Sequence, residues 1–247
     1  MELQEFFREH RRVALAFSGG VDSAYLLYAA QAAGAQVGAF LLQTPFQPAF
    51  EIEDAHRMAA MLGIELEVIP LDVLEEAAVA ANPADRCYHC KTAMFARLCH
   101  RAREKGYPVV IDGTNASDDA GDRPGMRALR ELGVRSPLRE CGLTKEEIRR
   151  RSQAAGLFTW DKPAYACLAT RIPTGEPITA EKLCRVEGAE AALRELGFSD
   201  LRVRLLGEAA RLQLPSDQME RAVTARREIR QALAPWFETV LLDLRER

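Results

Sequence analysis

The sequence predicts an α/β fold with a parallel sheet flanked by helices, followed by a smaller C-terminal α+β domain. Short apolar runs alternate with segments of helical periodicity through the first part of the chain, as they do in βαβ units. Glycines stand where several helical segments end. The 247 residues are 48% hydrophobic, which suffices for a buried core and excludes a disordered chain.

The first strand is predicted where the run VALAF meets a Ser-Gly-Gly turn, which a helical pattern follows until Gly34. Gly63 and Gly106 end two later helical segments. A capping-box pattern at Thr144 and Glu147 predicts a further helix. The predicted strands are 13–17, 36–42, 64–69 and 108–112, and the predicted helices are 21–33, 51–62, 91–105 and 144–156.

The segment 160–177 contains three prolines and is predicted to be a long loop. It places the boundary between a domain of residues 1–172 and one of residues 173–247. The second domain is predicted to have helices at 179–196 and 216–233 and strands at 201–206, 210–214 and 239–244.

Charge and composition exclude several classes of protein. The 33 Lys and Arg residues nearly balance the 36 Asp and Glu residues, so a purely basic nucleic-acid-binding module is not expected. No apolar run approaches the roughly 20 residues that span a bilayer, and the beginning MELQEFFREHRR lacks a signal-peptide core. We therefore expect a cytoplasmic protein without a membrane segment. Six cysteines are too sparse for a disulfide scaffold.

The turn after the first strand has the composition of a phosphate-binding loop. Its small residues let the backbone approach a ligand, and the following helix offers N–H groups that bind anions. It lacks the lysine and spacing of a Walker A loop and the spacing of a dinucleotide fingerprint, although an ordinary tight turn remains an alternative. The residues concerned are Ser18, Gly19, Gly20, Val21, Asp22 and Ser23.

A second polar turn, Asp112 and Gly113, ends a later strand, and ligands of open α/β sheets bind at that edge. We expect it to face the same crevice as the first turn. The polar residues that follow form either part of the site or a solvated acidic loop. They are Asp118, Asp119, Asp122 and Arg123.

Three cysteines are candidate metal ligands. Cys87 and Cys90 form a CxxC motif, and Cys167 lies in the proline-rich loop. Three thiolates suit a [4Fe-4S] cluster with one open iron, whereas structural zinc takes four ligands, the fourth of which His89 could supply. A redox CxxC of thioredoxin type is less favoured. The remaining cysteines are interpreted as structural: Cys99, Cys141 and Cys184.

The hexapeptide SGGVDS resembles the PP-loop of the ATP pyrophosphatase superfamily, whose members cleave ATP between the α and β phosphates and adenylate a substrate. Over nearly the whole chain, the motifs SGGVDS, NPADRCYHCK, DGTNASDD, RPGMRAL and WDKPAYACLATRIPTG are similar to the LarE family. That family makes pyridinium-3,5-bisthiocarboxylic acid mononucleotide, the organic part of the nickel-pincer cofactor of lactate racemase. The resemblance implies adenylation of a carboxylate, sulfur transfer and loss of AMP.

The resemblance also implies roles for individual residues. The loop from Ser18 to Ser23, with Asp112 and Gly113, would bind ATP, and Asp22 would help to hold Mg²⁺. The alternative for Asp22 is that it only complements the helix dipole. Arg171 would neutralise charge that develops during the reaction. The implied substrate-binding residues are Lys162, Glu190, Arg202 and Arg204. Arg202 and Arg204 share one face of a predicted strand, which could bind phosphate or could simply be exposed. Glu190 lies on a predicted amphipathic helix, where it could equally be a solvated residue.

The chain departs from part of the family at the source of sulfur. Some members sacrifice a cysteine, and alignment through Lys162 and Arg171 puts Ala166 at that position, with Cys167 one place further on. Members with a CxxC motif and this shifted cysteine resemble the branch that binds a [4Fe-4S] cluster. We therefore predict catalytic sulfur transfer with Cys87, Cys90 and Cys167 as cluster ligands.

The same loop and cysteines are compatible with other functions. The main alternatives are a tRNA thiolase and a non-catalytic ATP-binding module with structural zinc; an amidotransferase-type synthetase would need ammonia from another chain. The expected partners are the pyridinium mononucleotide, an external sulfur donor and lactate racemase maturation proteins, without a membrane and without nucleic acid. The resemblance further implies a homo-oligomer.

Overall fold

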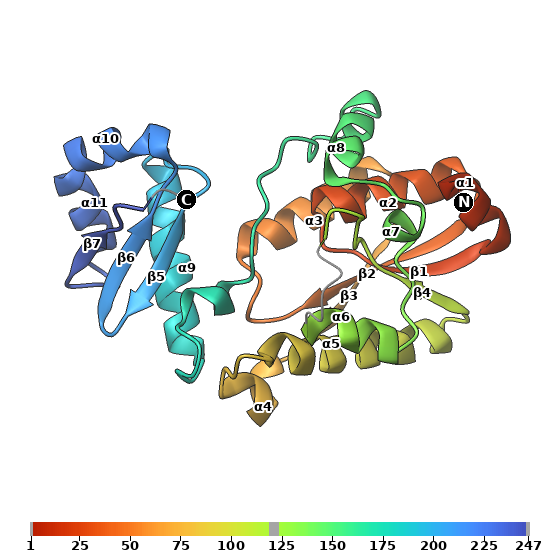
Figure 1. Cartoon of the computed structure of the whole chain (residues 1–247), viewed down its shortest axis with the longest axis horizontal. Helices are drawn as coiled ribbons and strands as arrows, with labels where there is room; N and C mark the ends of the chain where they lie inside the picture. The colour runs from red at the N-terminus through yellow and green to blue at the C-terminus, as the bar shows by residue number, and fades with distance from the viewer. Residues whose placement is uncertain (1, 119–123, 246–247) are drawn as a thin grey trace. The chain divides into compact units, whose positions relative to one another are not determined.

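The computed structural model describes residues 2–118 and 124–245. The chain forms two compact units (Figure 1). The first extends to Glu76 and resumes with Asp85–Ala164, and the second comprises Ala77–Ala84 and the residues from Tyr165 onward. No pattern in the sequence indicates that Ala77–Ala84 leaves the first unit.

The first unit contains a four-stranded parallel sheet in the order β3-β2-β1-β4. Leu15 of β1 lies beside Ala39 on one side and Ile111 on the other. The strand order reverses between β1 and β4, and ligands of such sheets bind at the carboxyl ends of strands flanking that point. The predicted parallel sheet is thus confirmed, with β1 Arg12–Ala16, β2 Gln36–Gln43, β3 Leu66–Pro70 and β4 Val109–Ile111.

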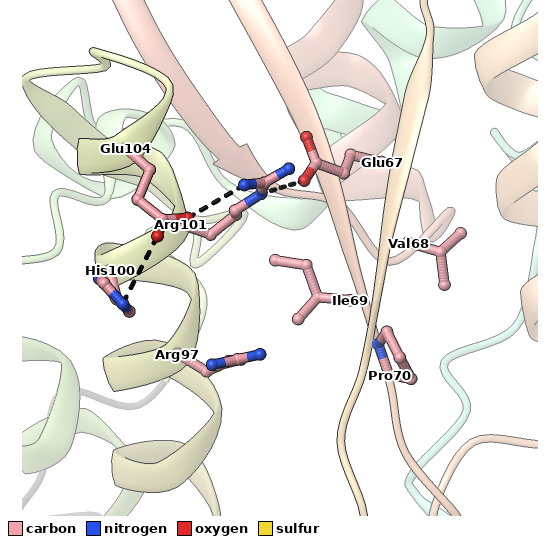
Figure 2. Close-up of a pocket in the computed structure, with 8 residues that line it drawn as sticks. All are labelled: Glu67, Val68, Ile69, Pro70, Arg97, His100, Arg101 and Glu104. Carbon is pink, nitrogen blue, oxygen red and sulfur yellow. Dashed lines mark hydrogen bonds and ion pairs between the residues drawn. The ribbon is translucent and has the colours of Figure 1, made fainter.

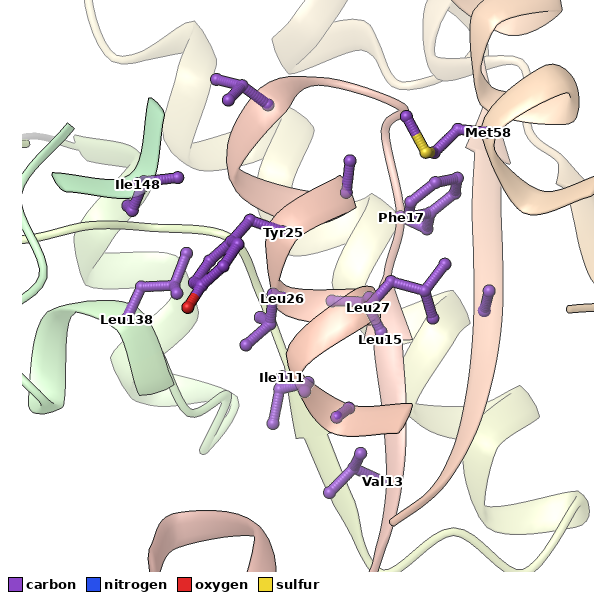
Figure 3. Packing of buried hydrophobic residues seen from close by; sticks show 14 of the residues in the cluster. Val13, Leu15, Phe17, Tyr25, Leu26, Leu27, Met58, Ile111, Leu138 and Ile148 are labelled. Carbon is purple, nitrogen blue, oxygen red and sulfur yellow. The ribbon is translucent and has the colours of Figure 1, made fainter. Parts of the chain in front are cut away.

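Helices cover both faces of this sheet. Side chains alternate between the faces of a strand, so Val13 and Leu15 pack on one side and Ala14 on the other. Figure 3 shows the first side, where Leu26 of α2 and Met58 of α3 meet β1. On this side lie α1 Leu3–Glu9, α2 Val21–Ala32, α3 Ala49–Met61, α7 Pro137–Glu140 and α8 Lys145–Ala154; α5 Arg86–Glu104 and α6 Pro124–Glu131 contribute to the opposite core.

Helix α5 begins at Arg86, five residues before the predicted start at residue 91. The CxxC motif therefore lies in the first turn of a helix and not in the loop before it. The helical pattern was hard to detect there because the first turn of α5 has no aliphatic residue and so shows no apolar stripe.

The second unit combines a three-stranded sheet, in the order β5-β6-β7, with three longer helices. Strands β5 and β6 form an antiparallel hairpin, and β7 pairs with β6 in parallel. The helix predicted at 216–233 is broken at Ala225, whose ψ of 17° departs from helical geometry. The elements are α9 Ala180–Glu195, β5 Arg202–Leu206, β6 Ala209–Gln213, α10 Ser216–Thr224, α11 Arg226–Leu233 and β7 Val240–Leu242.

Asn82 fixes the segment Ala77–Ala84, which includes helix α4 (Ala77–Ala80), within the second unit. Its backbone has a φ of 55°, a conformation that Asn tolerates better than most residues. The buried side-chain amide donates to the carbonyl oxygens of Pro173 at 2.8 Å and Glu176 at 3.1 Å. The segment is therefore held by polar contacts. The periodicity of apolar residues in the sequence gives no sign of them. The short 3₁₀ helix η1, Val73–Glu75, precedes it.

Among the described residues, no helix has the length and apolar character needed to cross a bilayer.

Candidate functional site

The loop from Ser18 to Ser23 joins the carboxyl end of β1 to α2, which places it at the reversal point of the sheet. Gly19 has a φ of +73°, and a Cβ atom there would lie 2.6 Å from the Cα atom of Ala55 in α3. Only glycine fits this combination of conformation and close approach. The packing of α3 against the turn therefore holds the loop in one shape.

Hydrogen bonds within the loop keep its backbone ordered. The Ser23 hydroxyl donates to the Gly20 carbonyl at 3.2 Å and accepts from the Ser18 amide at 3.3 Å. Gly20 stands at the N-cap of α2, and no side chain caps that helix. The first-turn amides, together with the positive end of the helix dipole, offer donors that suit phosphate oxygens.

The carboxylate of Asp22 in the first turn of α2 is partly buried beside a cation. Lys145 places its Nζ atom 2.6 Å from Asp22 Oδ2, and the Asn115 amide donates to Oδ1 at 3.3 Å. Burial raises the pKa of Asp22 above its usual value, and the hydrogen bond and charge of Lys145 act in the opposite direction. The site thus holds a carboxylate and an ammonium group next to the phosphate-binding amides.

Lys145 is a functional candidate that the sequence analysis missed. It is the first residue of α8, whose N-cap Thr144 accepts a hydrogen bond from the Glu147 amide at 3.3 Å. The backbone amide of Lys145 also donates to the Ser117 hydroxyl at 2.9 Å. The capping box predicted the start of this helix, but nothing in that pattern indicated that the start lies beside Asp22.

The turn after β4 lies against the phosphate-binding loop, as predicted. A Cβ atom on Gly113 would lie 3.1 Å from the Ser23 amide nitrogen, so the two turns touch. The buried carboxylate of Asp112 accepts from the Ser136 hydroxyl at 2.6 Å and from the Thr114 hydroxyl at 2.5 Å. Asp112 therefore holds the shape of this turn. Asp118 accepts from the backbone N–H of Asn115 at 2.9 Å, whereas Asp119, Asp122 and Arg123 lie outside the described residues.

Lys162 belongs to the first unit and is tied to α3. Its Nζ atom lies 2.8 Å from Glu51 Oε1 and 2.7 Å from Asp54 Oδ2. Its backbone carbonyl accepts a hydrogen bond from the Arg149 guanidinium at 2.6 Å. The charge of Lys162 is thus balanced by two carboxylates.

The CxxC cysteines lie about one helical turn apart at the start of α5, so Cys87 and Cys90 share a face. Arg86 places Nη2 3.8 Å from Cys87 Sγ, and Cys90 Sγ lies 3.6 Å from the sulfur of Met94. His89 pairs instead with Asp85, at 3.4 Å.

Cys167 belongs to the second unit, where it precedes the 3₁₀ helix η2, Leu168–Arg171. Across residues 2–118 and 124–245, no three His, Cys, Asp or Glu side chains gather into a metal-binding group, and none of the six cysteines forms a disulfide. Burial raises the pKa of Cys99 and of Cys141, which agrees with a structural role, and Cys184 is exposed on α9.

Four arginines of the second unit gather around Glu190 and Tyr165. The fully buried Glu190 carboxylate accepts from Arg171 Nε at 2.7 Å, from Arg194 at 3.2 Å and from the Val203 amide at 3.0 Å. Tyr165 donates a short hydrogen bond to the same carboxylate. Arg202 lies 4.6 Å from the centre of the Tyr165 ring. Arg204 donates to Thr170 and Gln213.

This cluster carries more positive than negative charge in a partly dehydrated setting. Burial, and next the charge of Arg171, lower the pKa of Arg202 to about 10. The same two causes lower the pKa of Arg204. An anion bound at these guanidinium groups would relieve their repulsion and replace lost hydration. The cluster is therefore suited to an anionic ligand such as a phosphate group.

A separate cavity of about 270 Å³ lies between β3 and α5 (Figure 2). Arg101 spans it, pairing with Glu67 and with Glu104, the latter at 3.0 Å. His100 lies 3.7 Å from Glu104. The charged groups of this cavity largely satisfy one another, so the phosphate-binding loop and the arginine cluster are the better candidate sites.

Comparison with known proteins relates these features to a family. The family model for asparagine synthase matches residues 4–122. An uncharacterized protein of Synechocystis sp. is 42% identical over 90% of this chain and 83% of its own length. The tRNA-specific 2-thiouridylase of Thermotoga petrophila is 26% identical over 61% of this chain and 54% of its own length.

The pyridinium-3,5-bisthiocarboxylic acid mononucleotide synthase of Lactiplantibacillus plantarum is 33% identical over 96% of this chain and 87% of its own length. The match extends through both compact units, and so includes both the phosphate-binding loop and the arginine cluster. The chain therefore belongs to the LarE family and is an ATP-using sulfurtransferase with a PP-loop.

Proposed function

We propose that the protein adenylates the carboxylates of pyridinium-3,5-biscarboxylic acid mononucleotide and converts them to thiocarboxylates for the nickel-pincer cofactor of lactate racemase. The observation that carries this proposal is that the chain has both an anion-binding PP-loop, in one unit, and an arginine cluster, in the other. The first suits ATP and the second suits the phosphate of a mononucleotide. The Lactiplantibacillus plantarum relative is named for this product.

In the first step, a carboxylate oxygen of the substrate attacks the α-phosphorus of ATP. The bond between that phosphorus and the bridging oxygen breaks, and pyrophosphate leaves with the electron pair. The amides at the start of α2 and the ammonium of Lys145 stabilise the charge on the leaving group. The Asp22 carboxylate offers the oxygen ligand that Mg²⁺ prefers, and the ion would neutralise phosphate charge there. Gly113 keeps the two turns close enough for one ligand to contact both.

In the second step, sulfur attacks the acyl carbon, and AMP leaves as the carbon–oxygen bond breaks. The sulfur comes from an external donor. Cys87 and Cys90 fit two neighbouring ligands of a [4Fe-4S] cluster, because both thiols project from one turn of α5. Cys167 would supply the third ligand. When bound, such a cluster would supply sulfur-relay chemistry, so that the transfer would consume no cysteine of the chain.

Arg202 and Arg204 would bind the phosphate of the mononucleotide, because guanidinium groups offer paired donors to phosphate oxygens. Glu190 and Arg171 act as positioning residues in this proposal. Both are almost inaccessible to solvent, and both oxygens of Glu190 already accept hydrogen bonds. Lys162 would contribute its charge to substrate binding. Its ion pairs with Glu51 and Asp54 would fix its position.

A tRNA thiolase is the second candidate, favoured by the similarity to the Thermotoga petrophila 2-thiouridylase. That similarity covers only 61% of this chain, whereas the match to the mononucleotide synthase covers 96%. We further propose that the enzyme works in the cytoplasm as a homo-oligomer and delivers its product to lactate racemase maturation proteins.

The reaction itself gives the first prediction. Anaerobic protein given the pyridinium dicarboxylate mononucleotide, ATP and a sulfide donor should form AMP and pyrophosphate in equal amounts, with thiocarboxylate detected by mass spectrometry. The Asp22→Asn variant should lose about 10²-fold or more of this rate, whereas the exposed Asp161→Asn should not. Formation of ADP would contradict the proposal, and thionucleosides formed in added tRNA would favour the second candidate.

The second prediction concerns Lys145. Removing the ammonium in Lys145→Met should raise the KM for ATP by about 10-fold or more, because charge-assisted hydrogen bonds contribute about 1.5–3 kcal/mol. Lys145→Arg should restore part of the loss, and the exposed Lys105→Met should behave as the parent protein. An unchanged KM and turnover in Lys145→Met would show that this lysine only neutralises Asp22.

The third prediction concerns the cysteines. Anaerobically purified protein should contain about four irons and four sulfides per chain. Each of Cys87→Ala, Cys90→Ala and Cys167→Ala should lose them, whereas Cys99→Ala should keep them. Zinc without iron would instead support a structural metal site. Protein active without any metal would point to sulfur carried on a cysteine.

The fourth prediction tests the positioning role of Glu190. Glu190→Gln should lower the free energy of unfolding by about 3–5 kcal/mol, because it leaves the buried Arg171 without its counter-ion. Chemical denaturation measures this change, and the exposed Glu195→Gln provides the control. A loss below about 1 kcal/mol would mean that the pair does not organise the second unit.

A further inference from the structure

A chain of hydrogen bonds in the second unit leads to the guanidinium of Arg204. Its middle residue is Gln213, the last residue of β6, which lies directly opposite Arg202 in the pairing of β5 with β6. Arg204 stands two positions further along β5, so its side chain leaves the same face of the hairpin as that of Gln213. Arg204 Nε donates to Gln213 Oε1 at 2.5 Å. Gln213 is therefore a direct neighbour of a guanidinium group to which the proposed function assigns a phosphate.

Asp243, which follows β7, fixes the other end of the Gln213 amide. Gln213 Nε2 donates to Asp243 Oδ2 at 2.9 Å. This hydrogen bond, and next the one from the Arg245 backbone amide, hold the pKa of Asp243 below its usual value, so its carboxylate is ionised at neutral pH. An ionised carboxylate only accepts hydrogen bonds, and a guanidinium only donates them. The amide can therefore join the two in one orientation only, with its carbonyl oxygen toward Arg204.

The protein holds one side of the Arg204 guanidinium and leaves the other for a ligand. Nε is bound to Gln213, and Nη1 donates to the Thr170 carbonyl oxygen. Within the part of the chain that the structure describes, Nη2 has no hydrogen-bond partner. Two fixed nitrogen atoms set the plane of a guanidinium, so the direction in which Nη2 points is set as well.

The uncharged amide of Gln213 also leaves the positive charge of Arg204 uncompensated. Arg204 forms no ion pair among the described residues, and the Asp243 carboxylate lies instead 3.6 Å from Arg211 Nε. A glutamate at position 213 would accept the same hydrogen bond from Nε. It would also place a carboxylate against Arg204, which would weaken the attraction of this group for a phosphate.

We infer that Gln213 is a positioning residue for the phosphate group of the substrate and that it acts through Arg204. Asp243 sets the orientation of the Gln213 amide, and the amide holds the guanidinium plane, so that Nη2 meets a phosphate oxygen with its charge intact. This role rests on the function proposed above for Arg204. It makes the contacts of Arg204 with Gln213 and Asp243 a determinant of the preference for a mononucleotide over a nucleoside.

Calorimetric titration without ATP tests this role. The parent protein should bind the pyridinium dicarboxylate mononucleotide at least about 10-fold more tightly than the corresponding nucleoside, which lacks the phosphate. Gln213→Met removes the acceptor for Nε, and Gln213→Glu compensates the charge. Each should raise the Kd of the mononucleotide about 10-fold and leave the Kd of the nucleoside unchanged. Asp243→Ala should change the two values in the same direction as Gln213→Met, because the amide of Gln213 can then turn.

A double-mutant cycle shows whether Gln213 acts through Arg204. The effect of Gln213→Met on the Kd of the mononucleotide should vanish when Arg204→Met is already present. The exposed Gln231→Glu on α11 is the matched control and should bind as the parent protein does. Circular dichroism, thermal unfolding and an unchanged KM for ATP should show that the variants fold as the parent does.

Several results would overturn this role. They are a parent protein without preference for the mononucleotide, Gln213 variants with the parent Kd, an equal rise in the Kd of the nucleoside, and an undiminished effect of Gln213→Met beside Arg204→Met. Because the titration needs no turnover, its outcome is separate from that of the reaction. A parent protein that prefers the mononucleotide and yet forms no thiocarboxylate would contradict the proposed function and not the role of Gln213.

Discussion

The close approach of helix α3 to the turn after β1 is the constraint on which the ATP site depends. Gly19 can accept it because it has no Cβ atom, which would lie 2.6 Å from the Cα atom of Ala55. The turn then directs the first amides of α2 outward at the edge where the strand order reverses. Asp22, the second residue of α2, lies beside Lys145 because the same turn sets the start of the helix. One backbone conformation therefore sets the phosphate-binding amides, the carboxylate and the cation together.

A buried ion pair plays the corresponding part in the second unit. Burying the Glu190 carboxylate is costly unless its oxygens are satisfied, and Arg171, Arg194 and the Val203 amide satisfy them. The pair also fixes the arrangement of three elements, because Arg171 belongs to η2, Glu190 to α9 and the Val203 amide to β5. Arg202 remains in this cluster with its pKa lowered by burial and by Arg171. In the proposed function, an anion bound beside Arg202 would offset the repulsion between these guanidinium groups.

The sequence predicted what depends on local pattern and missed what depends on contacts between distant segments. The run at 13–17, the turn after it and the stop at Gly34 each follow from short-range rules, and the structure confirms them. The start of α5 was placed too late because its first turn carries no apolar stripe. Lys145 was missed because its partner lies 123 positions away. Asn82 anchors Ala77–Ala84 to the second unit through carbonyl groups about 90 positions away, which no periodicity encodes.

In the proposed reaction, the substrate carboxylate attacks the α-phosphorus of ATP at the PP-loop. Substrate labelled with ¹⁸O in its carboxylates tests this step directly, because the bridging oxygen must leave with AMP when sulfur replaces it. We predict one ¹⁸O atom in AMP for each thiocarboxylate formed and none in pyrophosphate, as measured by mass spectrometry. AMP without label, or label in pyrophosphate or free phosphate, would contradict the account.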